Sequence, residues 1–283
     1  MPSLRPPSER QETSLRIWHQ SFTVLEDVPA YMARVRAHID RVKRADTQVD
    51  LHGLKPQTYP ANYPGDDLGF GFLFGMHASQ WAAHALTAER EGYDAFAMCT
   101  MIDPLFRELK TIVDIPVVAA GELCFHLAAM NGHRFGMLLF MDRVIPRYHE
   151  QIRMCGLTER CAGIRPTGMT FRDVMDGFDR PGPAIDRFRK SARELIAAGA
   201  DVIIPGEIPM NVLLATEGVT RVDDALVLDG LGATIKMTET AVDMKSMLGL
   251  SHSRHGFFNA APRPERVAAV MDFYLGDRIS NGG

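Results

Sequence analysis

The chain has 283 residues, of which 46% are hydrophobic and 23% charged, and its formal net charge at pH 7 is -4. This composition is typical of a globular protein with one large or two modest domains, and it argues against a disordered chain. The small negative charge, without any block of basic residues, argues against a nucleic-acid-binding protein, and no apolar run approaches the about 20 residues that span a bilayer.

The first residues, MPSLRPPSERQETS, are polar and rich in proline. They predict a disordered tail over 1–13 and no secretory signal. Four cysteines in a chain of this length indicate reduced thiols, which predicts a cytoplasmic protein. Because no CxxC pair is present, a thiolate zinc site is not expected.

Short apolar runs alternate with segments of helical period, which predicts βαβ units and mainly parallel sheets, an α/β fold. The first strand is predicted at 15–22 and a helix follows at 27–45. Then come a strand at 48–53, a helix at 78–92 and strands at 94–100 and 116–121. Further strands are predicted at 134–140, 162–166, 201–206 and 225–229.

Two stretches, 54–76 and 166–183, carry many proline and glycine residues and are predicted to be irregular. Long loops in compact α/β proteins often form lids or binding loops. The aromatic residues in 54–76 favour a covered lid over a surface insertion, because exposed aromatic patches are rare. For 166–183 both interpretations stay open.

The chain also contains a short internal echo. EGYDAFAMCT (91–100) and AGADVIIPGE (198–207) share a glycine, one intervening residue, an aspartate and then a buried strand. Aligning the two segments places Thr100 opposite Glu207 and Cys99 opposite Gly206. Sites in α/β proteins lie at the carboxyl ends of strands, so these positions are candidates for function.

These segments resemble the aspartate/glutamate/hydantoin racemase superfamily over about residues 14–250. GYDAFAMCTMIDP (92–104), GADVIIPGE (199–207) and the link IPVVAAGE followed by GHRFGMLLF carry the resemblance. It implies two pseudo-symmetric halves, each a mainly parallel sheet flanked by helices, with the active-site cleft between them. The expected boundaries are 14–118 plus 229–283 for the first half and 119–228 for the second.

The resembling family keeps a catalytic cysteine at the end of one strand in each half, and this chain departs from that pattern. Glu207 replaces the second thiol, and Thr100 occupies the place of the first, with Cys99 one residue early. A mechanism that uses two thiols therefore does not transfer to this sequence.

The family chemistry is proton transfer at a carbon beside a carbonyl or carboxylate, and Glu207 is the expected acid/base. Desolvation would raise the pKa of its carboxyl group, whereas the helix that follows would lower it. A simple helix-start acid is the structural alternative. Thr100 or Cys99 is expected on the opposite face of the substrate. Alternatively, Thr100 only caps the end of its strand, and Cys99 is a buried structural thiol.

Other residues are expected to bind substrate through their positions at strand ends and helix starts. A backbone N–H at a helix start can hold a developing oxyanion. These residues are His19, Gln20, Ser21, Met101, Ile208 and Glu122. No metal is expected. No nucleotide cofactor is expected either, because the sequence has neither a P-loop nor a GxGxxG motif that opens a helix after a strand.

Two classes of function fit the sequence. The first is a cofactor-independent, isomerase- or racemase-type enzyme that acts on a small carboxylate or cyclic amide; hydrolysis of a lactone, lactam or imide, and decarboxylation, are alternatives in the same cleft. The second is a non-catalytic small-molecule binding protein. The resemblance also implies a homo-oligomer, and no nucleic-acid or membrane partner is expected.

Overall fold

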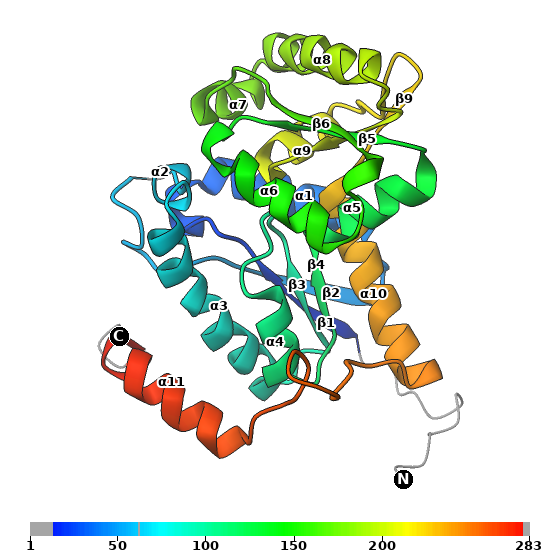
Figure 1. Cartoon of the computed structure of the whole chain (residues 1–283). Helices are drawn as coiled ribbons and strands as arrows, with labels where there is room; N and C mark the ends of the chain where they lie inside the picture. The colour runs from blue at the N-terminus through cyan, green and yellow to red at the C-terminus, as the bar shows by residue number, and fades with distance from the viewer. Residues whose placement is uncertain (1–13, 62, 280–283) are drawn as a thin grey trace.

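The computed structural model describes residues 14–61 and 63–279, with side chains described as far as residue 274. The predicted tail at 1–13 lies outside the described residues. Two sheets form, stacked end to end, with helices around each (Figure 1). This is the expected α/β architecture of two mainly parallel halves.

The first sheet has the strand order β2-β1-β3-β4, and its strand pairs are parallel. The register places Ile17 beside Val49 on one side and beside Ala95 on the other. Its strands are β1 (Leu15–Gln20), β2 (Thr47–His52), β3 (Ala95–Met98) and β4 (Val117–Ala119).

The second sheet has the order β6-β5-β7-β9-β8 and is parallel except for the antiparallel pair β8–β9. Met137 in the sheet centre pairs with Ile204. The strands are β5 (Phe135–Leu139), β6 (Cys161–Pro166), β7 (Val202–Pro205), β8 (Arg221–Val222) and β9 (Ala225–Val227).

The helices cover both sheets. α3 and α10 pack on β3, α8 packs on β5 and β6, and α5 packs on β5 and β7. The α-helices are α1 (Pro29–Val42), α2 (Gly65–Leu68), α3 (Gly71–Arg90), α4 (Phe106–Ile112), α5 (Ala120–Asn131), α6 (Ile145–Met154), α7 (Phe171–Gly177), α8 (Pro181–Ala197), α9 (Ile208–Thr216), α10 (Gly230–Leu248) and α11 (Pro264–Ile279). Short 3-10 turns lie at Leu25–Asp27, Asp142–Val144 and Thr158–Arg160.

The central strands are apolar along their whole length because helices cover both of their faces. Every residue of β3, β5 and β7 is buried. Strands buried on two faces read as continuous apolar runs instead of alternating ones, which explains why the sequence pattern located them well.

The two stretches predicted to be irregular contain helices. α2 lies within 54–76 and α3 begins at Gly71, seven residues before the predicted helix start; α7 and the start of α8 lie within 166–183. Glycine and proline often interrupt helices, which is why the sequence pattern predicts irregular structure here. Pro181 begins α8, where a missing N–H is tolerated, and Gly71 begins α3.

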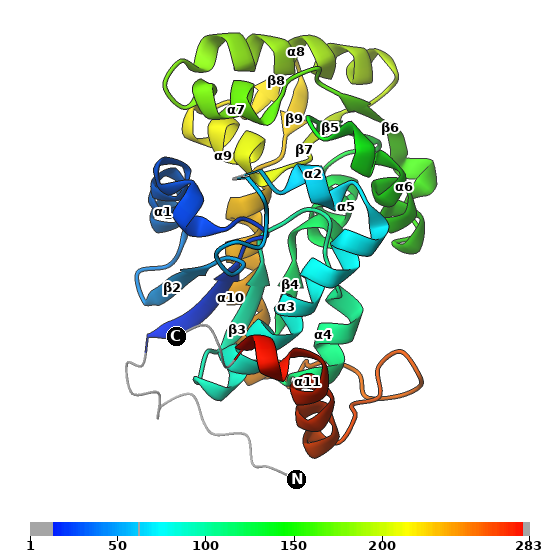
Figure 2. The same ribbon diagram turned by 90° about the vertical axis from the view of Figure 1, so that its left-hand side faces the viewer.

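The chain returns from the second sheet to the first through α10, which contacts α5, α1, β3 and β4. It then continues into α11, which projects from the lower end of the molecule (Figure 2). The division of the chain at 118 and 229 into two folding units stays a prediction. No helix among the described residues combines the length and apolarity needed to cross a bilayer.

Candidate active site

A small cavity of about 50 Å³ lies where the carboxyl ends of strands from the two sheets meet. Segments that follow β1, β3, β5 and β7 all contribute to its wall, and α1, α2, α6 and α7 add further side chains. Its lining residues are Ser21, Phe22, Thr23, Tyr31, Tyr63, Pro64, Leu68, Cys99, Thr100, Met101, Ile102, Phe140, Met141, Tyr148, Phe171, Gly206, Glu207, Ile208 and Pro209. The cleft between halves that the resemblance implied thus has a counterpart in the structure.

Glu207 stands between the end of β7 and the start of α9. Its backbone is extended, with φ -132° and ψ 144°, and α9 begins at the next residue. Gly206 allows this strand end to lie against β5, because a Cβ atom there would come within 2.0 Å of Leu139 Cδ2 and 3.0 Å of the Leu138 carbonyl oxygen. The close approach brings the Glu207 side chain to the loop that follows β5.

The Glu207 carboxylate does not cap its own helix. Oε1 accepts hydrogen bonds from the backbone N–H groups of Phe140, at 3.0 Å, and Met141, at 2.9 Å. Oε2 is buried and has no hydrogen-bond partner among the described residues. A buried oxygen without a partner is energetically unfavourable in a resting protein, and this one belongs to a residue that lines the cavity.

Burial raises the pKa of Glu207 from 4.5 to about 8, and the two backbone N–H groups oppose the shift without cancelling it. Only 4% of the residue is exposed to solvent. At pH 7 the protonated form is therefore favoured by about tenfold. Strongly shifted carboxyl groups in cavities are candidates for proton transfer near neutral pH.

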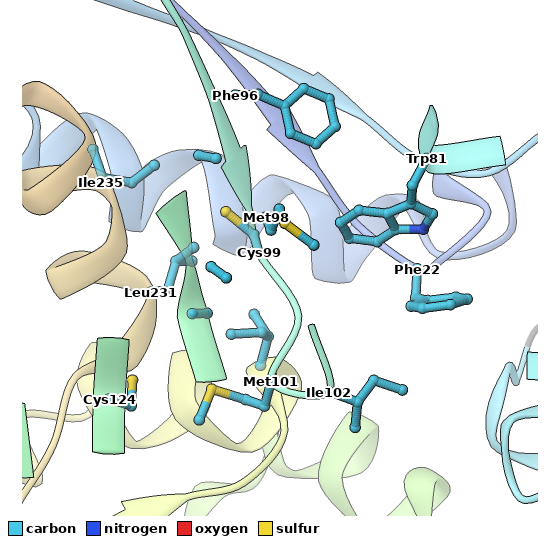
Figure 3. Packing of buried hydrophobic residues seen from close by; sticks show 14 of the residues in the cluster. Phe22, Trp81, Phe96, Met98, Cys99, Met101, Ile102, Cys124, Leu231 and Ile235 are labelled. Atoms are coloured by element: carbon cyan, nitrogen blue, oxygen red, sulfur yellow. The ribbon is translucent and has the colours of Figure 1, made fainter. Parts of the chain in front are cut away.

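Thr100, Cys99 and Met101 line the same cavity at the end of β3. Cys99 is 2% exposed and packs among apolar side chains (Figure 3). Burial raises the pKa of its thiol, so the reactive thiolate is disfavoured. Thr100 is partly exposed and presents the more accessible polar group of the two.

The substrate-binding candidates separate into two groups. Ser21 and Ile208 line the cavity, together with Met101. The structure does not bring His19, Gln20 or Glu122 to its wall.

Gln20 lies in a buried network, in which its Oε1 accepts hydrogen bonds from Trp18 Nε1, at 2.9 Å, and from His84 Nδ1, at 2.8 Å. His19 is also buried, and burial lowers the pKa of its imidazole to about 3. Glu122 is partly exposed in the first turn of α5. Gln20 therefore links β1 to α3, and strand alternation turns its side chain away from the cavity.

Sequence reasoning missed six aromatic residues of the cavity wall, namely Phe22, Tyr31, Tyr63, Phe140, Tyr148 and Phe171. Tyr148 on α6 is buried and its hydroxyl donates to the Gly206 carbonyl oxygen at 2.8 Å, which fixes the residue before Glu207. Tyr63 and Phe171 come from the two stretches predicted to be irregular. Their aromatic content was the signal available in the sequence.

Asp103 was also missed, and it positions the loop after β3. Its φ of 41° lies in the left-handed region, and its carboxylate accepts from the backbone N–H of Gly121, at 2.9 Å, and of Glu122, at 2.6 Å. Gln151 on α6 adds a third hydrogen bond at 3.2 Å. Burial raises the pKa of Asp103 to about 7. These contacts hold the Cys99–Thr100–Met101 segment against the second half.

The cavity wall carries no positive charge. Among the described residues that line it, none is arginine, lysine or histidine, and Glu207 is the single carboxylate. Nor does any group of three or more His, Cys, Asp or Glu side chains in the described part of the chain lie close enough together to hold a metal ion.

Comparison with known proteins places the chain in a family. The family described as Asp/Glu/Hydantoin racemase matches residues 75–238. A hydantoin racemase from Paenarthrobacter aurescens is 27% identical over 158 residues, covering 50% of this chain and 66% of that relative, just under two thirds.

Solved structures agree with the fold. The allantoin racemase from Klebsiella pneumoniae has a TM-score of 0.73 and 23% identity, covering 88% of this chain and 94% of its own. The allantoin racemase from Pseudomonas fluorescens has a TM-score of 0.70 and 22% identity, covering 88% and 98%. The family match supports an isomerase- or racemase-type enzyme. The chain belongs to the Asp/Glu/hydantoin racemase family.

Proposed function

We propose that the protein catalyses proton exchange at a carbon beside a carbonyl group, with Glu207 as the acid/base. The observation that carries the proposal is the Glu207 Oε2 atom, buried and without a partner in a residue that lines the cavity. Since two backbone N–H groups hold Oε1, the carboxyl plane is fixed and Oε2 is the oxygen left for the substrate. Such positioning favours proton transfer.

The proposed substrate is a neutral cyclic amide of the hydantoin type. A carboxylate bound in this cavity would be desolvated beside Glu207 with no cation in the described wall to pair with it. A neutral ring with carbonyl and N–H groups avoids that penalty and can hydrogen-bond to the Thr100 and Ser21 hydroxyls. The names of the relatives, hydantoin racemase and allantoin racemase, are consistent with this class.

The two faces of the cavity differ in basicity. Glu207 exchanges a proton near neutral pH, whereas burial raises the pKa of the Cys99 thiol and Thr100 has only a weakly basic hydroxyl. This asymmetry favours a second candidate, an isomerase that moves a double bond by removing and returning a proton on one face. Release of the enol and its reprotonation by solvent outside the cavity gives the racemase outcome.

The test is incubation of 5-substituted hydantoins in D2O, followed by NMR and by optical rotation. Deuterium entry at C5 is expected, and Glu207→Gln is expected to reduce it by about 10²-fold or more. Glu217→Gln, an exposed acid at the far end of α9, is the matched control and should be unaffected. Undiminished exchange in Glu207→Gln would refute the role, and tight binding without exchange by the wild type would establish a binding protein.

The pH dependence gives an independent check. Removal of the substrate proton requires ionised Glu207, so kcat/KM for exchange should rise about tenfold between pH 7 and pH 9 as the group with a pKa of about 8 ionises. A profile that is flat across this range would place the base elsewhere. Hydrolysis would instead show as a ring-opened product in the same spectra.

We also propose self-association through the C-terminal arm, residues 250–274. Four of its aromatic side chains are strongly exposed: Phe257 by 92%, Phe258 by 69%, Phe273 by 78% and Tyr274 by 72%. At about 150–250 Å² each they present roughly 600 Å², near the about 800 Å² that one partner contributes to a stable interface. A second copy supplies the same apolar surface in return.

Light scattering after size exclusion tests this arrangement. We expect a dimer or larger species for the wild type and a monomer for the double variant Phe273→Asp, Tyr274→Asp. Met130→Asp alters an equally exposed apolar side chain on the other half and should keep the oligomer. A monomeric wild type, or an oligomeric double variant, would contradict the proposal.

A further inference from the structure

The cavity at Glu207 is too small to hold the proposed substrate as it stands. Its volume is about 50 Å³, whereas sites for small molecules usually measure about 300–1,000 Å³. Glu207 itself is 4% exposed. Part of the wall must therefore move before any substrate reaches Oε2.

Among the described residues, two aromatic pairs join the halves beside the cavity: Tyr31–Phe178, with ring centroids 5.9 Å apart, and Tyr63–Phe171. The rings of Tyr63, from the first half, and Phe171, from the second, are stacked with centroids 4.9 Å apart and planes 21° apart. The Phe140 ring also contacts Phe171, with ring centroids 6.2 Å apart. Tyr63 lies just before α2, and Phe171 is the first residue of α7. The two helices lie near each other in both views of the fold (Figures 1 and 2).

The Tyr63 side of this contact is anchored. Before it, the Tyr59 hydroxyl donates to the Phe22 carbonyl oxygen at 3.0 Å, and after it, Asp67 pairs with His77 at 2.8 Å. The Tyr63 ring also lies directly over Gly65, where a Cβ atom would come within 2.1 Å of Tyr63 Cζ. Any side chain at position 65 would displace the ring, so glycine there sets the position of Tyr63.

The Phe171 side combines fixed points with one flexible position. The preceding fixed point is Thr167, whose N–H donates to the Leu139 carbonyl oxygen at 2.7 Å. Gly168 lies between Thr167 and Phe171, with φ +69° and no atom within 4 Å of the position that a Cβ would take. Glycine in an open, left-handed conformation permits backbone rotation at little steric cost. Met169, the next residue, is buried and its N–H donates to Thr167 Oγ1 at 3.3 Å, so the backbone is held as far as Met169. The freedom of Phe171 therefore lies in its ring, which is only partly buried in the first turn of α7.

We propose that Tyr63 and Phe171 form an aromatic gate that admits the substrate and limits the size of its ring substituent. The gate opens when the Phe171 ring leaves the anchored Tyr63 ring, and it closes over the bound substrate to exclude water from Glu207. The role in specificity rests on the proposed function, whereas the gating of access to Glu207 does not. Lids that close in this way protect proton-transfer steps from solvent.

The first experiment measures access to Glu207 without any substrate. A water-soluble carbodiimide with a small amine labels accessible carboxyl groups, and mass spectrometry of the peptide gives the rate at Glu207. We compare the wild type with Phe171→Ala, Tyr63→Ala and Tyr63→Phe. Phe72→Ala, a nearby aromatic that is 77% exposed and outside the cavity wall, is the matched control.

Removal of either ring should increase the labelling rate at Glu207 about two- to tenfold, the range that the energy of one aromatic pair implies. Tyr63→Phe keeps the ring and should match the wild type, as should Phe72→Ala. Gly65→Ala displaces the Tyr63 ring and should raise the rate as Tyr63→Ala does. Equal rates in wild type, Phe171→Ala and Tyr63→Ala would overturn the gate, whether or not the protein acts on hydantoins.

The second experiment uses hydantoins with a methyl or a benzyl substituent at C5. Phe171→Ala should raise kcat/KM for the benzyl compound relative to the methyl compound, mainly through KM. An unchanged ratio, with faster labelling at Glu207, would retain the gate for access and reject its role in specificity. If no hydantoin reacts with the wild type, the proposed function fails while the labelling result still decides the gate.

Discussion

Replacing Glu207 with glutamine should make the protein more stable at alkaline pH while it slows proton transfer. Burial raises the pKa of Glu207 from 4.5 to about 8 in the folded protein. Between these two values the folded state binds more protons than the unfolded state, so the free energy of unfolding falls as pH rises. The stabilising contribution of protonated Glu207 is fully present below pH 4.5 and is lost by about pH 8.

The magnitude follows from the size of the shift. Each unit corresponds to about 1.4 kcal/mol, so the ionisable group costs about 3 kcal/mol of stability at pH 7 and about 5 kcal/mol above pH 8. Glutamine has no such dependence. Its Oε1 can still accept the N–H groups of Phe140 and Met141, but its amide nitrogen takes the place of the unpartnered Oε2. An unpaired buried amide costs about 1–3 kcal/mol and offsets part of the gain.

The assay is urea unfolding of wild type, Glu207→Gln and Glu217→Gln at pH values from 5 to 9. The variant Glu207→Gln should be less stable than the wild type at pH 5 and more stable by about 2–4 kcal/mol above pH 8. Glu217 is exposed at the other end of the same helix, and its substitution should stay within about 0.5 kcal/mol of the wild type.

The decisive quantity is the difference in unfolding free energy between wild type and Glu207→Gln as a function of pH. If this difference is constant from pH 5 to pH 9, Glu207 is ionised throughout and the argument from burial is refuted. If the difference instead changes with the expected slope while Glu207→Gln keeps its exchange activity, Glu207 is buried and protonated but takes no part in the reaction.

Two further outcomes follow from the geometry of the strand ends. Gly206→Ala should destabilise the fold by about 1–3 kcal/mol and lower kcat, because the added Cβ would lie 2.0 Å from Leu139 Cδ2. Thermal unfolding measures the change. Gly182→Ala, in the first turn of α8, is the control, because no atom lies within 4 Å of the position of its Cβ. Cys99→Ala should retain most of the exchange activity, since burial keeps the thiol protonated; a loss of 10²-fold or more would instead assign the chemistry to Cys99.

Much of the fold could be predicted from the sequence because the central strands are buried on both faces. The runs around Val202, Phe96 and Met137 are continuous and apolar, and the structure places each in the middle of a parallel sheet. The helices over 71–77, 171–177 and the start of α8 escaped prediction. Packing against neighbouring elements stabilises them in spite of a weak local preference, a contribution that a single sequence does not reveal.

For the candidate site, the sequence by itself determined that an acid follows a buried strand at Glu207, in the place where the resembling family keeps a thiol. Tertiary structure alone decided what surrounds that acid: the two N–H groups that hold Oε1, the unpartnered Oε2 and the aromatic residues that close the cavity. Tertiary structure also decided that the Gln20 side chain lies in a buried hydrogen-bond network with Trp18 and His84. The physical reason is that desolvation and hydrogen bonding depend on residues far apart in the chain, such as Met141, Tyr63 and Phe171, which only folding brings to Glu207.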